Sequence, residues 1–274
     1  MDEKYFTNTL GLSCIENYLL GLLKMQGIEP CYLFYDSVLS LDELFDCFID
    51  KGMKYEYFRG IKRLQSLAIK HGIISYSTVS DPFSEADYKT TANNEYILVR
   101  AKSEYIADVF HHKSWRNDHF VLLYSLDGNL FCFNDSTKSS ALVENFEDLY
   151  DGEYISIKVL GNSSEDFFTL FKEKLGLSKE NKIVGNYDEF SDLNILRDIL
   201  LVYRIISKRI LAFVNLYQVA VNFNFESIDK YLFKTEYLRN RNPVNKEFCK
   251  ETIKYLYEIE EQLWRVLCKI EQMK

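Results

Sequence analysis

The chain has 274 residues, of which 47% are hydrophobic and 15% aromatic, a composition typical of one large or two modest packed domains rather than of a disordered chain. The formal net charge of -8 argues against broad binding of nucleic acid, which requires a basic surface. No uninterrupted apolar run approaches the roughly 18 to 20 residues of a membrane-spanning helix, so we expect neither nucleic acid nor a membrane as a partner.

The first predicted element is a helix that begins at Cys14. Ser13 and Glu16 have the spacing of a capping box, in which the serine caps the helix and the glutamate reaches back to the capping residue. Apolar residues then recur on one helical face, and Gly27 ends the segment. The pattern places Cys14 in the first helical turn.

Several further elements are expected up to residue 160. Residues 40–51 and 61–71 have the apolar spacing of amphipathic helices. The polar stretch 75–94 shows little periodicity and contains an Asp-Pro turn, so we predict a long surface loop or lid there. Residues 96–99 and 154–159 are typical of strands.

A hairpin supplies the centre of the predicted antiparallel sheet. Asp127-Gly128 is a strong turn signal between strands at residues 119–124 and 129–133. Residues at equal distances from the turn face each other, which brings His119 and Asp135 to the same edge of the sheet.

The chain changes character after residue 160. Apolar residues then recur almost only at helical spacing, over residues 165–175, 192–222, 227–239 and 243–272, with Pro243 suited to a first helical turn. We therefore predict two domains, residues 1–160 and 161–274. The predicted fold class is α+β, with an N-terminal helix packed on an antiparallel sheet and then an all-helical domain.

Six cysteines without a CxxC pair indicate reduced thiols rather than a zinc or redox motif. Residues 1–9 lack the basic run and apolar stretch of a secretory signal, so we expect a cytoplasmic protein. His111, His112 and His119 are close in sequence, but no carboxylate or cysteine at ligand spacing completes a metal site. We expect no metal and no cofactor of the protein's own.

Cys14, His119 and Asp135 have the residue types of a thiol-dependent catalytic triad. A helix N-terminus directs N–H groups and positive partial charge at a thiol, which favours the reactive thiolate. A histidine takes the thiol proton, and a carboxylate holds that histidine in the required tautomer. Each residue alone is more often structural, as a buried thiol, an interior histidine or a turn former, and only the set is specific.

The set resembles the papain-like cysteine peptidase superfamily over residues 8–160. The likeness lies in the cysteine that opens a helix, the strand 96–99, and the segments 118–123 and 131–135. Within the superfamily the chain is similar to the bacteriocin-processing peptidases and to the N-terminal domain of the butirosin acyltransferase. The resemblance implies a papain-like first domain and does not extend to the helical remainder.

The resemblance also assigns roles to residues. It implies that Cys14 is the nucleophile, His119 the base and Asp135 the group that orients the base. The peptidases carry a glutamine six residues before the cysteine as an oxyanion donor, and this chain has Asn8 there. The asparagine side chain is one carbon shorter, so we expect the backbone N–H of Cys14 to carry part of that role.

The resemblance leaves two enzymatic interpretations open. In the first, Cys14 takes an acyl or peptidyl group from the phosphopantetheine thioester of a carrier protein and passes it to an amine, such as a small diamine. Such amide formation occurs in aminoglycoside tailoring and in closthioamide-type thiotemplated peptide biosynthesis. The alternative is a cysteine peptidase, but those relatives are usually fused to a membrane transporter, which favours the transferase. A third interpretation is a catalytically inactive papain-like scaffold.

The transferase hypothesis makes expectations about binding. For the amine, Asp118 or Glu95 is a candidate carboxylate beside the thiol. The helical domain and residues 75–94 are candidates for the carrier dock and the lid. Because carrier proteins are acidic, a positive patch is expected, and two clusters supply candidates. These clusters are Lys208 with Arg209, and Arg239 with Arg241 and Lys246.

Overall fold

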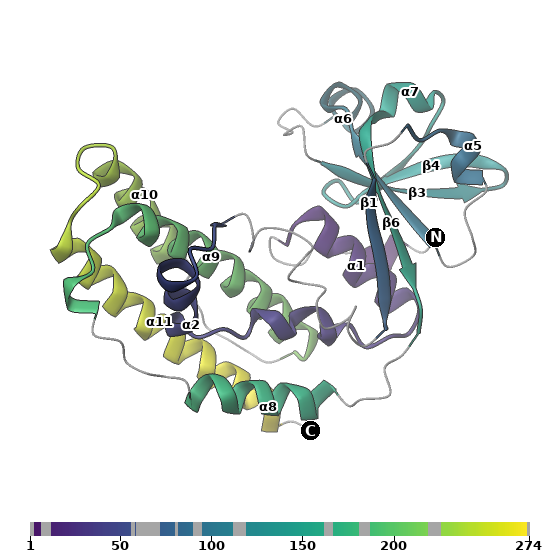
Figure 1. Ribbon diagram of the computed structural model, residues 1–274. Coiled ribbons are helices and arrows are strands. Elements are labelled where there is room, and N and C mark those ends of the chain that lie inside the picture. Colours follow the sequence, from purple (N-terminus) through teal and green to yellow (C-terminus); the bar gives the residue numbers. More distant parts are fainter. Residues whose placement is uncertain are drawn as a thin grey trace. The chain divides into compact units, whose positions relative to one another are not determined.

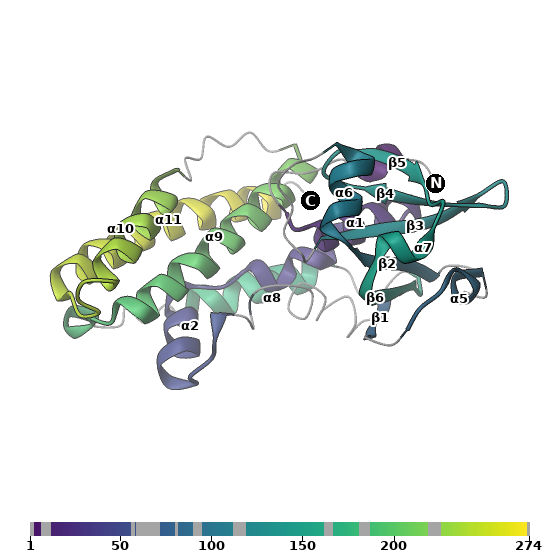
Figure 2. The ribbon, with the colours of Figure 1, turned by 90° about the horizontal axis from the view of Figure 1, so that it is seen from above.

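A computed structural model of the chain describes residues 3–6, 12–55, 58, 72–79, 82–89, 95–111, 119–161, 167–180, 187–218 and 226–272. The chain divides into two compact units. Figures 1 and 2 show the chain with colours that follow the sequence. We call them the sheet unit, Met1–Pro30 with Leu67–Ser164, and the helical unit, Cys31–Ser66 with Glu165–Lys274.

The sheet unit is a mixed arrangement of helices and strands. Its elements are η1 (Glu3–Phe6), α1 (Cys14–Met25), β1 (Ile74–Val79), α5 (Glu85–Lys89), β2 (Glu95–Ala101), α6 (Ser103–Phe110), β3 (Phe120–Leu126), β4 (Asn129–Asn134), β5 (Ser139–Leu142), α7 (Phe146–Leu149) and β6 (Tyr150–Val159). Within the described ranges, six strands form one sheet in the order β1-β6-β2-β3-β4-β5, with antiparallel neighbours throughout. The predicted helix beside an antiparallel sheet is confirmed at this level.

Both faces of the sheet are covered. Alternate residues of the central strands, among them Val99 and Val121, pack with Ile106 of α6 and Leu149 of α7 in one buried cluster. The opposite face receives α1, where the ring centroid of Tyr18 lies 6.4 Å from that of Phe133. The sheet is therefore buried on both sides, which explains why β2 and β3 are nearly continuous apolar runs.

Local chemistry accounts for the N-terminus of α1. The Ser13 side chain accepts a hydrogen bond from the Glu16 backbone at 3.4 Å, and the Ser13 N–H donates to the Glu16 carboxylate at 2.7 Å. The predicted capping box is confirmed, and Cys14 is the first residue of the helix. Within α1, a Cβ atom at Gly21 would lie 2.3 Å from the Phe6 ring, so only glycine lets η1 pack this closely.

The hairpin follows from its turn residues. Asp127 and Gly128 have φ angles of 51° and 80°, as a type I′ turn requires. Leu126 then pairs with Asn129 and Leu122 with Phe133, which confirms the predicted register. The hairpin carries His119 and Asp135 just beyond its open end.

The prediction of a loop over residues 75–94 is wrong in its described part. Residues 74–79 form the edge strand β1, which pairs with β6 from Ile74 opposite Val159 to Val79 opposite Tyr154. Ile74 is the buried residue of this edge strand, and its sequence is otherwise largely polar, which gives a weak strand signal. Residues 85–89 form the short helix α5.

The helical unit contains η2 (Pro30–Ser37), α2 (Leu41–Phe45), η3 (Asp46–Asp50), α8 (Phe167–Glu180), η5 (Tyr187–Glu189), α9 (Leu193–Leu216), α10 (Glu226–Arg239) and α11 (Lys246–Gln272). The helix expected at residues 61–71 lies outside the described residues. Pro243 does not open α11, because the helix begins after Asn245, whose side chain accepts from the Phe248 N–H at 3.0 Å. None of the described helices combines the length and apolar character needed to cross a bilayer.

The predicted division at residue 160 holds for the C-terminal helices but not for residues 31–66. This earlier segment belongs to the helical unit, and long-range hydrogen bonds explain why. The Leu41 N–H donates to the Glu260 carboxylate at 2.5 Å, while the Tyr257 hydroxyl donates to Asp42 at 2.6 Å. The domain boundary is thus crossed three times, near residues 30, 66 and 164.

Candidate active site

The candidate site lies where the N-terminus of α1 meets the end of β4. Cys14 is half-buried in the first turn of the helix. Asn17 and Tyr18 follow three and four residues later, so their side chains share the helical face on which Cys14 lies.

Hydrogen bonds fasten this face of α1 to the sheet. The Asn17 amide donates to the Asp135 carboxylate at 2.8 Å. The Tyr18 hydroxyl donates to the Phe133 carbonyl at 2.9 Å and accepts from the Asp135 N–H at 3.1 Å. The residues one turn after Cys14 therefore bind Asp135 from both its side chain and its backbone.

His119 is buried directly beside Asp135. Its carbonyl accepts from the Ala101 N–H at 2.9 Å, which fixes the histidine backbone at the end of β2. Its ring Nε2 lies 3.2 Å from the Asn134 side-chain oxygen and 3.8 Å from an Asp135 oxygen. Of these two contacts, the one with Asn134 is within hydrogen-bond distance. The sequence-based expectation named Asp135 as the orienting group. Asn134 joins it beside the ring, because the strand ends at Asn134 and presents that amide first.

Asn134 determines the histidine tautomer. Its side-chain oxygen also accepts from the Ser136 N–H at 3.0 Å, so the atom that faces the ring is the carbonyl oxygen and not the amide nitrogen. An acceptor at this position requires a proton on His119 Nε2. In the neutral ring the basic nitrogen is then Nδ1.

Burial dominates the electrostatics of Asp135, whose exposed fraction is 2%. It raises the pKa of the carboxyl, whereas the hydrogen bond from Asn17 and the charge of His119 oppose that rise. Burial likewise raises the pKa of Tyr18 well above its usual range, and the nearby charges of Asp135 and Cys14 add to the effect. Cys14 and Asp135 thus both lie close enough to the Tyr18 hydroxyl to act on its ionisation.

His119 and Asp135 lie side by side, and Cys14 lies one helical turn before Asn17 and Tyr18, which bind Asp135. The other predicted site residues do not all join them. Asn8 and Asp118 lie outside the described residues. Glu95 is the first residue of β2, and Ala101, which bonds to the His119 carbonyl, is the last. Six residues separate them, and at about 3.3 Å per residue Glu95 lies about 20 Å from Ala101 along the strand. Its carboxylate accepts a hydrogen bond from Ser156 instead. The expectation that Glu95 binds an amine beside the thiol is therefore not met.

A contact at the C-terminus of α1 shows in which direction the helix runs along the sheet. Gln26, which caps that end, donates to the Tyr96 hydroxyl at 2.5 Å. The helix therefore runs along the sheet from the His119 end to the Glu95 end, and Cys14 lies at the first of these.

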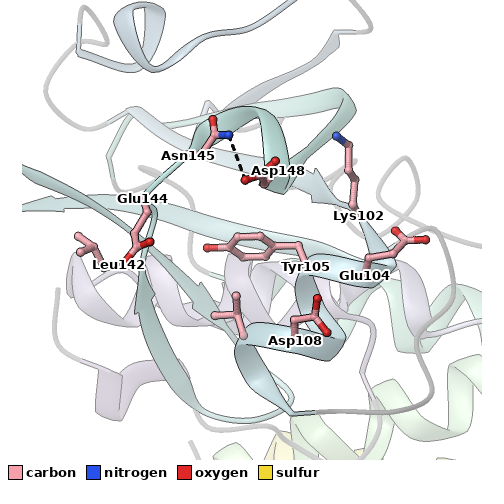
Figure 3. Close-up of a pocket in the computed structure, with 9 residues that line it drawn as sticks. Lys102, Glu104, Tyr105, Asp108, Leu142, Glu144, Asn145 and Asp148 are labelled. Carbon is pink, nitrogen blue, oxygen red and sulfur yellow. Dashed lines mark hydrogen bonds between the residues drawn. The ribbon is translucent and has the colours of Figure 1, made fainter.

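A separate cavity of about 840 Å³ opens between α6, the end of β5 and α7 (Figure 3). Its lining is Lys102, Glu104, Tyr105, Asp108, Val109, Leu142, Glu144, Asn145 and Asp148. The Tyr105 hydroxyl at its base lies 3.8 Å from the Cys132 sulfur, and burial raises the pKa of that thiol to about 11. None of Cys14, His119 and Asp135 lines this cavity, so it is distinct from the candidate active site.

Sequence reasoning missed Asn17, Tyr18 and Asn134. The first two carry a usable signal, because they are residues with polar groups one turn after a candidate nucleophile, on the same helical face. His111, one of the three histidines that are close in sequence, is the exposed C-terminal cap of α6 with a φ of 53°. Across the described residues, no group of three histidine, cysteine or acidic side chains gathers to hold a metal ion.

No protein-family model, curated protein or solved structure matches this chain. The geometry of the site is therefore the ground on which a function can be argued.

Proposed function

We propose that this chain is a papain-like thiol acyltransferase that moves an acyl or peptidyl group from a carrier-protein thioester through Cys14 to an amine. The observation that carries the proposal is the junction of α1 with β4, where Asn17 and Tyr18 hold Asp135 one turn from the thiol. The histidine at this junction has Nδ1 as the basic nitrogen of its neutral ring.

The first half of the reaction loads the enzyme. Nδ1 of His119 takes the Cys14 proton, and the thiolate attacks the thioester carbonyl to form a carbon–sulfur bond. The tetrahedral intermediate then expels the pantetheine thiolate, which recovers the proton from His119. The products are an acyl group on Cys14 and a free carrier thiol, and because one thioester replaces another the exchange is nearly neutral in energy.

The second half releases the product. An amine attacks the Cys14 thioester while His119 takes a proton from the attacking nitrogen. Collapse of the intermediate breaks the carbon–sulfur bond, returns the thiol and leaves an amide. The negative oxygen in both halves lies near the start of α1, where backbone N–H groups are not used by the helical ladder. Asn8 remains our proposed side-chain donor to that oxygen.

Burial of the base supports transfer over hydrolysis. His119 and Asp135 have exposed fractions of 7% and 2%, whereas Cys14 is half-buried and accessible. A site that limits water around the base protects the acyl-enzyme until an amine arrives. A cysteine peptidase with the same triad is the main alternative, and an inactive scaffold is the other.

The test is intact-mass detection of an acyl adduct on Cys14. The protein is mixed with acylated carrier protein, with and without small amines and diamines, and the Cys14→Ala variant is the matched control. We expect an adduct on the wild-type protein alone, followed by release of amide when amine is added.

Other results separate the alternatives. Release of free acid only, with peptides as better donors than thioesters, would assign the chain to the peptidases. If the folded protein forms no adduct with any donor, the inactive scaffold is the interpretation that remains.

A further inference from the structure

The outward face of α10 carries two exposed aromatic side chains. Phe233 and Tyr237 are 77% and 50% exposed, and Phe233 is the most exposed large hydrophobic residue among those described. They are four residues apart and so lie side by side on one helical face. The inner face of α10 is accounted for, because Ile228 and Thr235 are fully buried and Tyr231 stacks on Tyr255 of α11.

Positive charge surrounds this aromatic pair. Lys230 lies three residues before Phe233 on the same outward face, and the Arg241 guanidinium stacks over the Tyr237 ring at 4.2 Å. Lys234 instead lies over the Phe248 ring of α11 at 4.6 Å and pairs with Glu251 at 3.9 Å. Within the described part of the chain, neither Lys230 nor Arg241 forms an ion pair. We call Lys230, Phe233, Tyr237 and Arg241 the α10 patch.

The acidic residues of α10 do not cancel this charge. Asp229 is paired with Arg204 at 2.6 Å, and Glu236 is paired with Arg197 at 2.5 Å and with Arg239 at 2.7 Å. Most of the basic residues predicted for a partner are likewise engaged elsewhere. Arg209 is 3% exposed, and Lys246 contacts Glu189 at 2.7 Å. Of the predicted clusters, Arg241 is the member that joins the α10 patch.

We propose that the α10 patch docks an acidic amphipathic helix of a partner protein, with apolar side chains over Phe233 and Tyr237 and carboxylates beside Lys230 and Arg241. Large aromatic and arginine side chains supply much of the binding energy in protein interfaces. The opposite charges orient the incoming segment. This docking does not depend on the chemistry proposed for Cys14.

A protein segment fits the patch better than a nucleic acid or a membrane. A short helix stays within about 10 Å of the patch, the range over which its charges act at physiological salt. A nucleic acid or an anionic membrane extends beyond that range and meets a molecule whose net charge is -8.

The test uses the full chain and a fluorescent synthetic helical peptide with leucine and phenylalanine on one face and glutamate on both sides of it. Binding is followed by anisotropy at low and high salt, and hydrogen exchange locates the protected region. We expect salt-sensitive binding with protection at residues 226–241. Phe233→Ser and Lys230→Glu should each weaken it by about tenfold.

Matched controls lie elsewhere in the helical unit. Ile49 is 44% exposed and Lys172 is also exposed, so Ile49→Ser and Lys172→Glu change one exposed hydrophobic residue and one exposed lysine away from α10. These two variants should bind as the wild type does. The proposal is overturned if the wild-type chain does not bind the peptide, if the α10 variants bind it equally well, or if anionic vesicles or single-stranded RNA occupy the patch more tightly than the peptide.

Discussion

Each unit of the protein buries a carboxylate within a hydrogen-bond network, and the two networks differ in one respect. In the sheet unit, Asp135 accepts from Asn17 and lies beside His119. In the helical unit, Asp42 accepts from the hydroxyls of Tyr187 and Tyr257 at 3.1 and 2.6 Å. Both carboxylates are shielded from solvent, with exposed fractions of 2% and 8%.

The difference lies in what each carboxylate faces. Burial raises the pKa of Tyr187 and Tyr257 well above the usual range, and Asp42 raises both further, so these hydroxyls stay protonated at neutral pH. The Asp42 network therefore holds α2 against η5 and α11 and moves no proton. Asp135 faces a histidine, the side chain that titrates near neutral pH. A buried carboxylate is thus a sign of chemistry only when a group beside it can exchange a proton.

The largest expected effect is on the nucleophile. Cys14→Ala should reduce acyl transfer by a factor of about 1,000 or more, because the variant lacks the sulfur that carries the acyl group in the proposed covalent intermediate. Thermal unfolding should change little, since Cys14 is only half-buried. The matched control is Cys268→Ala, which removes a thiol of the same exposure class from α11 and should keep full activity.

The second prediction compares the two carboxylates through the same substitution. Asp135→Asn should lower activity about a hundredfold or more, because the imidazolium formed at His119 loses its counter-charge. Asp42→Asn should instead lower the free energy of unfolding by about 1 kcal/mol, since two hydrogen bonds to a charged acceptor become neutral. Activity assays and urea unfolding of both variants measure the contrast. Equal loss of activity in the two variants would remove the distinction drawn between the networks.

The raised pKa of Asp135 also predicts how the stability of the protein depends on pH. Because its pKa is raised in the folded state, the contribution of this group to stability is present below the unfolded value near 3.8 and is lost as the pH rises through the folded value. The ionised carboxylate therefore costs stability at neutral pH. Asp135→Asn should be at least as stable as the wild type at pH 7, and its advantage should disappear below about pH 4.

A smaller effect is expected at Tyr18. Tyr18→Phe keeps the ring on Phe133 but leaves the Phe133 carbonyl and the Asp135 N–H without their bridging hydroxyl. Unfolding free energy should fall by about 1 to 3 kcal/mol. Asp135 would also be held less firmly beside His119, so kcat should fall while binding of the thioester is retained. A change in unfolding alone, with unaltered kcat and pH profile, would reduce Tyr18 to a packing residue.

The parts of this fold that depend on neighbouring residues could be predicted from the sequence. The Ser13 capping box and the Asp127-Gly128 turn place Cys14 and the His119 hairpin, because their chemistry acts within a few residues. Residues 31–66 were assigned to the wrong unit, since the bonds that hold them reach Tyr257 and Glu260 in α11. A contact between residues so far apart along the chain leaves no signal in a local sequence pattern.

The candidate site also has features that could be predicted from neighbouring residues and features that could not. The residue types and the sheet edge were predictable from the hairpin, but the choice between Asn134 and Asp135 as the partner of His119 was not. That choice depends on the last residue of β4 and on where α1 approaches it, which are tertiary features. The strand β1 was missed because its sequence is largely polar.

The most direct test of the account is the rate at which iodoacetamide alkylates each thiol at neutral pH, read by peptide mass mapping. Burial raises the pKa of Cys132 to about 11 and of Cys249 to about 12, so these thiols should react slowly, and Cys268 of α11 serves as the half-buried reference thiol. We predict that Cys14 reacts at least about tenfold faster than Cys268, and that His119→Gln removes this advantage. Equal reactivity of Cys14 and Cys268, or an advantage that survives in His119→Gln, would contradict the claim that the thiol and the histidine act as a pair.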